Sequence, residues 1–394
     1  WTFIMKVLTL SSLYPNKIFP GRGSFIENKI LNLKNHYNID HRVVSPVPHI
    51  PLVGRFMPAQ KNFELIDDRE TRNGIEVIYP KYLHIPGLTM NIGPRNIYRA
   101  CRPAIQQLID DGFDFDIIDA HYAYPDGVAA YYLAKEFGKP FIVTALGTDI
   151  NILPNYKKPR GLIIETLANA DGVVAVSKDL CKKMIELGAS KDKTTPIYNG
   201  VDLNLFAPTD KQEACVKIGA SKNVLLSIGN LISLKGFDLI IKAMTNLEDA
   251  ELYIVGSGPE EANLKSLISE LGLENRVKLV GRLPQSELAT YYNAADIFVL
   301  ASSHEGMANV LLESLACGTP VVATPIAGME EVIATDQVGV IMPDRSVEAI
   351  VSSVRSLLDN IPDRANVREY AEQFSWKTTS KLQIELFEKI LNSE

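Results

Sequence analysis

The chain has 394 residues, a formal net charge of −7 and 46% hydrophobic residues. This length favours two or three domains, and the apolar content is ample for packed cores. No apolar run approaches the roughly 18 residues that a membrane span requires, and no low-complexity tail is present, so a membrane-spanning or disordered protein is excluded.

The first half alternates short apolar runs with amphipathic helical patterns, which is typical of parallel α/β sheets. The opening "WTFIMKVLTLSS" is too short in apolar residues for a signal peptide and leads into a strand near Lys6, with Met5 as a candidate start. Residues 48–100 break the rhythm with proline, glycine and aromatics, and we predict an insertion of loops and short strands with a surface or acceptor role. The predicted strands are 6–12, 41–47, 116–121, 140–146, 172–177 and 194–200.

A polar, turn-rich run at 199–214 is predicted to be a linker, after which the pattern restarts. Strands are expected at "NVLLSIGN", "AELYIVGSG", "NRVKLVG", "IFVLAS", "PVVAT" and "VGVIMP", with helices between most of them. The fold class that follows is α/β, with two Rossmann-like, doubly wound parallel-sheet domains in series. We place them at 1–206 and 207–374, and expect the C-terminal helix within 375–394 to pack back on the first domain.

Residues 1–205 hold 24 basic and 21 acidic residues, whereas 206–394 hold 16 and 26, so the two parts carry +3 and −10. The first part could face an anionic acceptor or a membrane surface, although ordinary variation between solvated faces explains the same numbers. The four cysteines are widely spaced without a C-x-x-C pattern, which argues against a zinc site or a disulfide framework and favours a reducing cytoplasm. The six histidines are dispersed too, and no metal is expected.

The stretch "SSHEGMANVLLESLACGTPVVAT" at 302–324 places Glu305 in a loop and Glu313 inside a helix predicted to start at Met307 or Ala308. The free amides of such a helix start favour an anion such as phosphate. The two acids are too far apart to share a proton, so each more plausibly accepts hydrogen bonds from a different part of a polyhydroxylated ligand. The alternative is an ordinary first-turn acid and a solvated helix residue.

This stretch resembles the nucleotide-sugar-binding segment of retaining glycosyltransferases of family four, glycosyl transferases group 1, whose architecture is GT-B. "EGMANVLLESLACGTPVVAT" matches that family's E-x7-E pattern and the strand after it. Further similar segments follow in the family's order: "YPNKIFPGRGSFI", "AHYAYPDG", "GTDI", "NGVD", "GNLISLKG", "VGSGP" and "VGRLP". The resemblance covers nearly the whole chain except 48–100, and is greatest to bacterial enzymes that build cell-surface polysaccharides. It implies two domains facing each other across a cleft.

The resemblance implies roles for residues of the second domain. Glu305 would contact hydroxyls of the donor sugar, Glu313 would hold the nucleotide ribose, and Lys235 would neutralise the diphosphate leaving group. Asn230 stands where the family usually has an arginine, so one of two cationic contacts is missing or comes from elsewhere. Leu283 would lie by the base through its backbone, with a core leucine as the alternative. The backbone amides implied to face sugar and diphosphate are those of Gly306, Met307, Ala308, Asn309 and Val310.

Three residues of the first domain are implied as well. Gly23 falls where a loop backbone approaches the phosphates, a role that suits a residue without a side chain. His121, at the end of a predicted strand, matches a histidine that reaches the reacting sugar, although a lone histidine there is more often structural. Asp149 of "GTDI" would face the acceptor, or else cap a helix.

The function implied is transfer of a hexose from a nucleoside-diphosphate sugar to an alcohol acceptor with retention, in a cytoplasmic enzyme of polysaccharide biosynthesis. The donor would be a UDP- or GDP-sugar, and no obligatory cofactor or nucleic-acid partner is expected. The acceptor would be a glycan or lipid-linked glycan, which could bring the enzyme to the inner face of the membrane as a peripheral protein. The alternatives are a nucleotide-sugar 2-epimerase of the same fold, an NAD-dependent dehydrogenase and a two-lobed solute-binding protein. The "GSG" of the second domain supports the dehydrogenase only weakly.

Overall fold

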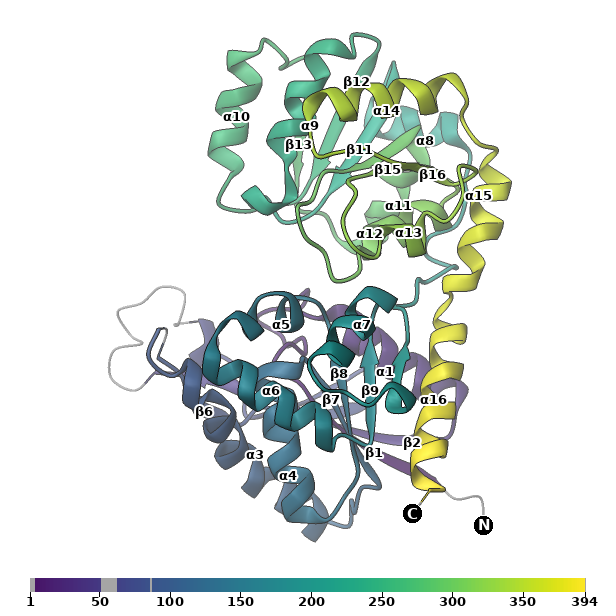
Figure 1. Ribbon diagram of the computed structural model, residues 1–394. Coiled ribbons are helices and arrows are strands. Elements are labelled where there is room, and N and C mark those ends of the chain that lie inside the picture. Colours follow the sequence, from purple (N-terminus) through teal and green to yellow (C-terminus); the bar gives the residue numbers. More distant parts are fainter. Residues whose placement is uncertain (1–3, 51–61, 86, 394) are drawn as a thin grey trace. The chain divides into compact units, whose positions relative to one another are not determined.

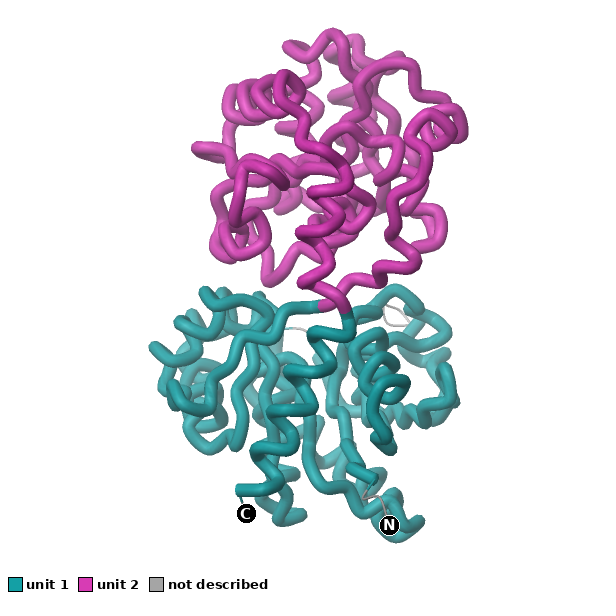
Figure 2. Tube along the Cα trace, turned by 90° about the vertical axis from the view of Figure 1, so that its right-hand side faces the viewer, with its two compact units in different colours: residues 1–199, 376–394 teal, residues 200–375 magenta. Residues whose placement is uncertain are grey.

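The structure, a computed structural model, describes residues 4–50, 62–85 and 87–393. These residues form two compact units (Figures 1 and 2). Unit 1 consists of residues 1–199 and 376–394, and unit 2 of residues 200–375. The boundary therefore lies at 199/200, where the sequence prediction had 206/207, and the chain returns to unit 1 for its last helix.

Unit 1 is built on one sheet whose strand order is β10-β9-β8-β7-β1-β2-β5-β4. All neighbouring strands pair in parallel except β4 and β5, which are antiparallel at one edge. The strands are β1 (Met5–Leu10), β2 (Ile39–Val44), β4 (Arg69–Arg72), β5 (Ile75–Ile78), β7 (Ile117–His121), β8 (Phe141–Ala145), β9 (Gly172–Ala175) and β10 (Thr194–Pro196). A separate pair joins β3 (Val47–His49) and β6 (Lys81–Leu83). The central strands are apolar on both faces, as a sheet covered by helices on both sides requires.

Helices cover both faces of this sheet (Figure 1). α1 packs against the C-terminal helix α16, whose Ile384 and Phe387 join the core formed by β1, β7, β8 and β9. α4 lies on the opposite face with α3 and α6 beside it. The helices are α1 (Ser24–His36), α3 (Gly93–Asp110), α4 (Val128–Phe137), α5 (Thr148–Asn151), α6 (Lys157–Asn169), α7 (Lys178–Glu186) and α16 (Trp376–Leu391).

Unit 2 is built on a wholly parallel sheet with the order β13-β12-β11-β14-β15-β16. The order reverses direction between β11 and β14, which is the switch point where ligands bind in open α/β sheets. The strands are β11 (Asn223–Ile228), β12 (Ala250–Val255), β13 (Val277–Gly281), β14 (Ile297–Leu300), β15 (Val321–Ala323) and β16 (Gly339–Ile341).

The helices of unit 2 also form two layers. α9, α10 and α14 share one core with the strands, and α8, α11, α12 and α15 pack among themselves in the other layer. Tyr292 of α11 is fully buried there, between the rings of Phe206 and Phe298. The helices are α8 (Lys211–Ile218), α9 (Phe237–Ala243), α10 (Glu261–Glu270), α11 (Gln285–Ala294), α12 (Asn309–Ala316), α13 (Met329–Val332), α14 (Val347–Asp359) and α15 (Arg364–Ala371).

This architecture confirms the predicted fold class and corrects two details. The predicted linker 199–214 contains the start of α8, whose first free amides are capped by the side chain of Asp210, which accepts from the amide of Glu213. The segment 48–100 is not only an insertion, because β5 extends the main sheet next to β2. Residues 51–61 of that segment lie outside the described residues.

Candidate active site

The sequence motifs of unit 2 follow the carboxyl ends of its strands. Asn230 and Lys235 follow β11, Leu283 follows β13, and Glu305 follows β14. Because all strands are parallel, these ends share one edge of the sheet, and β11 and β14 flank the switch point. The fold therefore gathers residues that are up to 75 positions apart in sequence onto the edge where a ligand is expected.

Lys235 and Glu305 contact each other directly. The Lys235 ammonium lies 2.5 Å from Glu305 Oε1, and both side chains are largely buried. The hydroxyl of Ser302 donates to the same carboxylate oxygen at 2.6 Å. A buried ion pair has a stronger Coulomb attraction than an exposed one, but its two charges have lost their hydration. An anionic ligand can therefore compete with Glu305 for the Lys235 ammonium.

The loop that carries Lys235 is fixed against the loop that carries Glu305. The amide of Ser303 donates to the carbonyl of Leu234 at 2.9 Å. Gly236 follows with φ +66°, and a Cβ there would come within 2.4 Å of the Ala301 carbonyl oxygen and 2.8 Å of Arg345 Nη2. Only glycine fits this turn, because the backbones approach too closely for a side chain. Arg345 Nε also donates to Ala301 O at 2.8 Å, which adds a cation that the sequence prediction missed.

Glu313 lies on α12 and is held by residues from α11. Tyr292 donates its phenolic hydrogen to Glu313 Oε2 at 2.8 Å, and the Gln285 side chain also bonds this carboxylate. Burial raises the pKa of Glu313 to about 7, although both hydrogen bonds act to lower it. The acid is therefore not the solvated helix residue that the alternative interpretation described.

The other residues expected at the donor site line the same edge. α12 begins at Asn309, two residues later than Met307, so the segment from Gly306 to Ala308 is a loop leading into the helix. Ala308 is buried, whereas Gly306, Met307, Asn309 and Val310 are partly exposed. Asn230 is exposed and Leu283 is partly exposed.

In unit 1, His121 ends β7 in a buried polar cluster. Its Nε2 donates to Asp119 Oδ2 at 3.1 Å, and its Nδ1 finds no hydrogen-bond partner among the described residues. His41 of β2 bonds Thr9 at 3.0 Å, and Lys29 of α1 is buried nearby. Burial would raise the pKa of Asp119, but His121, Lys29 and His41 outweigh it and lower this pKa to about 2. Burial lowers the pKa of His41 to about 4.

Asp149, for which the resemblance implied an acceptor-facing role, is the second residue of α5. Its carboxylate is fully buried and accepts from the amides of Ala123 (2.7 Å), Gly147 (2.8 Å) and Leu146 (3.1 Å). These bonds tie the start of α5 to the loop after β7; the N-cap of α5 is Gly147 without a side-chain cap.

Gly23 precedes α1 in the left-handed conformation, with φ +61°. A Cβ there would lie 2.1 Å from the Leu13 carbonyl oxygen, so the position requires glycine whether or not a ligand binds. The loop after β1 is also held by Asp126, which accepts from the amide (3.0 Å) and hydroxyl (2.8 Å) of Ser12. Sequence reasoning missed Asp126 although the motif "AHYAYPDG" contains it. Burial raises the pKa of Asp126 to about 7.

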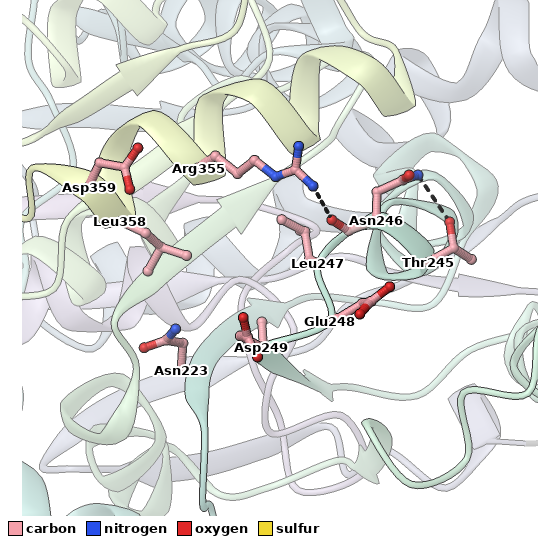
Figure 3. A pocket seen from close by; sticks show the side chains of 10 residues that line it. Asn223, Thr245, Asn246, Leu247, Glu248, Asp249, Arg355, Leu358 and Asp359 are labelled. Atoms are coloured by element: carbon pink, nitrogen blue, oxygen red, sulfur yellow. Dashed lines mark hydrogen bonds between the residues drawn. The ribbon is translucent and has the colours of Figure 1, made fainter.

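A pocket of about 500 Å³ lies elsewhere on unit 2 (Figure 3). Its lining includes Asn223 and Ala250, the first residues of β11 and β12, so it lies at the amino ends of the strands. Arg355 of α14 borders it and donates to the carbonyl of Asn246 at 2.6 Å. This pocket is therefore at the opposite edge from Lys235 and Glu305, and we do not assign the donor to it.

No group of three or more His, Cys, Asp or Glu side chains that could hold a metal ion occurs among the described residues. Within the same part of the chain, no helix is long and apolar enough to cross a membrane. Among the described residues, no disulfide joins the cysteines Cys101, Cys181, Cys215 and Cys317.

Comparison with known proteins identifies the family. The model for glycosyl transferases group 1 matches residues 209–374, and that for glycosyltransferase family 4 matches residues 63–205. The fold is GT-B, a glycosyltransferase architecture that consists of two α/β domains. The chain belongs to the family 4 glycosyltransferases and is a glycosyltransferase.

Three relatives illustrate the similarity. A putative teichuronic acid biosynthesis glycosyltransferase, TuaC of Bacillus subtilis, is 28% identical over 357 residues, covering 89% of this chain and 88% of the relative. A D-inositol 3-phosphate glycosyltransferase of Thermobispora bispora is 30% identical, covering 70% and 71%. The solved structure of Anabaena Alr3699/HepE in complex with UDP-glucose superposes with a TM-score of 0.72 at 20% identity, covering 98% and 100%. The dehydrogenase and solute-binding alternatives are therefore not favoured, and neither is the epimerase.

Proposed function

We propose that this glycosyltransferase moves a hexose unit from a nucleoside-diphosphate sugar to an alcohol acceptor with retention at the anomeric carbon. The observation that carries the proposal is the Lys235–Glu305 pair at the carboxyl ends of β11 and β14. A cation and a hydroxyl-binding acid held together at a switch point match a ligand that joins a diphosphate to a sugar.

Donor binding would exchange the partners of this pair. The diphosphate takes the Lys235 ammonium, and the Glu305 carboxylate turns to the sugar hydroxyls, with Ser302 keeping one oxygen in place. Glu313 accepts the ribose hydroxyls from its position on α12. Amides of residues 306–310 face the sugar and diphosphate, Asn230 lies beside the phosphates, and Leu283 lies by the base.

In the chemical step the bond between the anomeric carbon and the diphosphate oxygen breaks while the acceptor oxygen bonds to the same face of that carbon. The acceptor proton passes to an oxygen of the departing phosphate, so no protein carboxylate acts as nucleophile. Lys235 stabilises charge that appears only as the diphosphate leaves. For unit 1, the family resemblance implies that His121 acts on the reacting sugar and that the Gly23 loop contacts the phosphates.

For the donor, the HepE structure in complex with UDP-glucose supports a UDP-sugar over a GDP-sugar. For the acceptor, the teichuronic acid relative supports a glycan or a lipid-linked glycan in surface polysaccharide synthesis. Because the acceptor is a polymer or a lipid conjugate, we place the enzyme in the cytoplasm or at the inner face of the membrane.

A panel of UDP-, GDP- and ADP-sugars tests the donor. We expect a UDP-sugar to raise the melting temperature, because a ligand that binds only the folded state stabilises it. Incubation of that donor with candidate glycan acceptors should then give a product whose anomeric configuration, read by NMR coupling constants, equals that of the donor. An inverted product, stabilisation by NAD alone, or isomerised nucleotide sugar without transfer would contradict the proposal.

The raised pKa of Glu313 predicts a pH dependence of nucleotide binding. Ribose hydroxyls donate to the ionised carboxylate, so binding favours the deprotonated form, and affinity should rise as pH rises through about 7. Between pH 6 and 8 we expect a gain of up to about tenfold in UDP affinity by calorimetry. The control is Glu313→Gln, which keeps the shape but cannot ionise. Ionisation of UDP itself affects its binding to the wild type and to the variant equally. If UDP affinity varied with pH in the same way for both proteins, Glu313 would not bind the ribose as proposed.

A further inference from the structure

One region of unit 1 has a composition unlike the rest of the surface. Residues 87–109 contain Arg95, Arg99 and Arg102 and no acidic residue, and residues 150–164 contain Lys157, Lys158 and Arg160 and again no acidic residue. The two segments meet in the fold, because η2 (Met90–Ile92) lies against α6. Two acid-free stretches, far apart in sequence, thus come together on one side of the unit.

The same region exposes large apolar side chains. Leu88 is 76% exposed and Ile92 44%, while Ile152, Tyr156 and Ile164 are 41%, 48% and 37% exposed. A globular surface tolerates single apolar residues, but a group of them together marks an interaction site. We call these five residues with Arg95, Lys157, Lys158 and Arg160 the α6 surface.

The helix geometry of α6 aligns the two kinds of side chain. Lys157, Arg160 and Ile164 are spaced by three and four residues, so they lie along one stripe of the helix. The buried Ile163 and Leu167 face the unit instead. Among the described residues, no ion pair is formed by Lys157 or Arg160 of this stripe, or by Lys158, which lies beside the stripe on the side of α6 that also carries Glu165. Arg102 is the exception among the six basic residues, since it pairs with Glu136.

We infer that the α6 surface docks on the surface of an anionic lipid bilayer. The cations would contact lipid headgroups while Leu88, Ile92 and Tyr156 enter the boundary with the acyl chains, as basic amphipathic surfaces do. A soluble polyanion fits less well, because it would leave these apolar side chains in water. The charge asymmetry of the chain fits as well, since the basic part contains this surface and the acidic part, residues 206–394, does not.

This inference gives the proposed function a location, namely peripheral attachment of unit 1 where a lipid-linked acceptor is found. It stands on a surface outside the donor site, so the two can be tested separately. UDP binding, measured on the same preparations, reports the donor site. Vesicle binding reports the α6 surface.

The experiment is sedimentation of the full chain with phosphatidylcholine vesicles that contain or lack about one third phosphatidylglycerol. We expect binding only to the anionic vesicles. The triple variant Lys157→Ser, Lys158→Ser, Arg160→Ser should bind roughly one hundredfold more weakly, since each cation near an anionic surface adds about a factor of five. The matched control is Lys377→Ser, Lys381→Ser, Lys389→Ser on α16, which removes the same charge from exposed positions of the same unit and should bind as wild type does.

A second pair of variants separates lipid from polyanion. Leu88→Ser with Tyr156→Ser should weaken vesicle binding several-fold, whereas Val216→Ser, at 79% exposure in unit 2, should not. Heparin retention is the comparison arm for a soluble polyanion. Equal vesicle binding by the triple variant and its α16 control would overturn the inference. So would heparin retention without vesicle binding, or an apolar variant that binds vesicles as the Val216 control does. Unchanged UDP binding in every variant shows that the units remain folded.

Discussion

Replacing Lys235 with alanine is expected to lower the turnover number by about two powers of ten or more. The ammonium stabilises negative charge that grows on the diphosphate only as the glycosidic bond breaks, so its loss falls on the transition state more than on the bound donor. The turnover number at saturating donor and acceptor should therefore fall far more than donor affinity changes. The variant loses one contact to the donor phosphates, which lowers donor affinity. This loss is partly offset, because Glu305 no longer has an ion pair to break when the donor binds.

The control for this prediction is Lys242→Ala. Lys242 lies on the neighbouring helix α9, is about half exposed and pairs with Asp238 one turn away. It carries the same charge in the same unit without facing the edge of the sheet where Glu305 lies, so turnover should stay near that of the wild type. Lys235→Arg should recover part of the activity, because the charge remains while its geometry changes. Wild-type turnover in Lys235→Ala would remove the leaving-group role altogether.

Much of the fold was predictable because the strands and helices of parallel α/β sheets have recognisable patterns in the local sequence. Buried strands such as β12 and β14 are continuous apolar runs, and their carboxyl ends must share an edge, so the motifs after them could be placed together. The errors have local causes. β5 is only four residues long and offers little periodicity. α8 begins inside a polar run, although Asp210 and Glu213 form a capping pattern that could have revealed it.

The types of residue in the site could be predicted from the sequence, but the contacts between their side chains could not. The E-x7-E spacing indicated two acids with separate roles, yet nothing in it shows that Glu305 meets Lys235, which is 70 residues earlier. Tyr292 bonds Glu313 across the interface of α11 and α12, a contact between side chains that only tertiary packing creates. Asp149 accepts from two local amides, those of Leu146 and Gly147, but also from that of Ala123, 26 residues earlier, and the spacing of the sequence gave no sign of this contact.

The second large effect is expected on the stability of unit 1, at the buried polar cluster that contains Asp119, His121, His41 and Lys29. Asp119→Asn keeps the shape of the side chain but leaves buried Lys29 without its counter-charge, and loss of one partner of a buried charge pair typically costs about 3–5 kcal/mol. Lys29→Met alone should also destabilise, because Asp119 then loses one of the groups that hold its pKa low. The double variant removes both charges together and should recover about 1–3 kcal/mol relative to the sum of the single changes.

Tryptophan fluorescence can follow this cycle in urea, because Trp376 of α16 is buried in unit 1 and is the only tryptophan among the described residues. The control pair is Asp171→Asn with Lys29→Met. Asp171 also accepts a backbone amide, that of Phe141, but does not contribute to the field around Lys29, so these changes should add. If Asp119→Asn and Lys29→Met were equally additive, the two charges would not be coupled, and the low pKa of Asp119 would have to come from His121 and His41. A coupled result means that Lys29 of α1 holds Asp119 ionised, and thereby holds His121 at the end of β7 with its Nδ1 free.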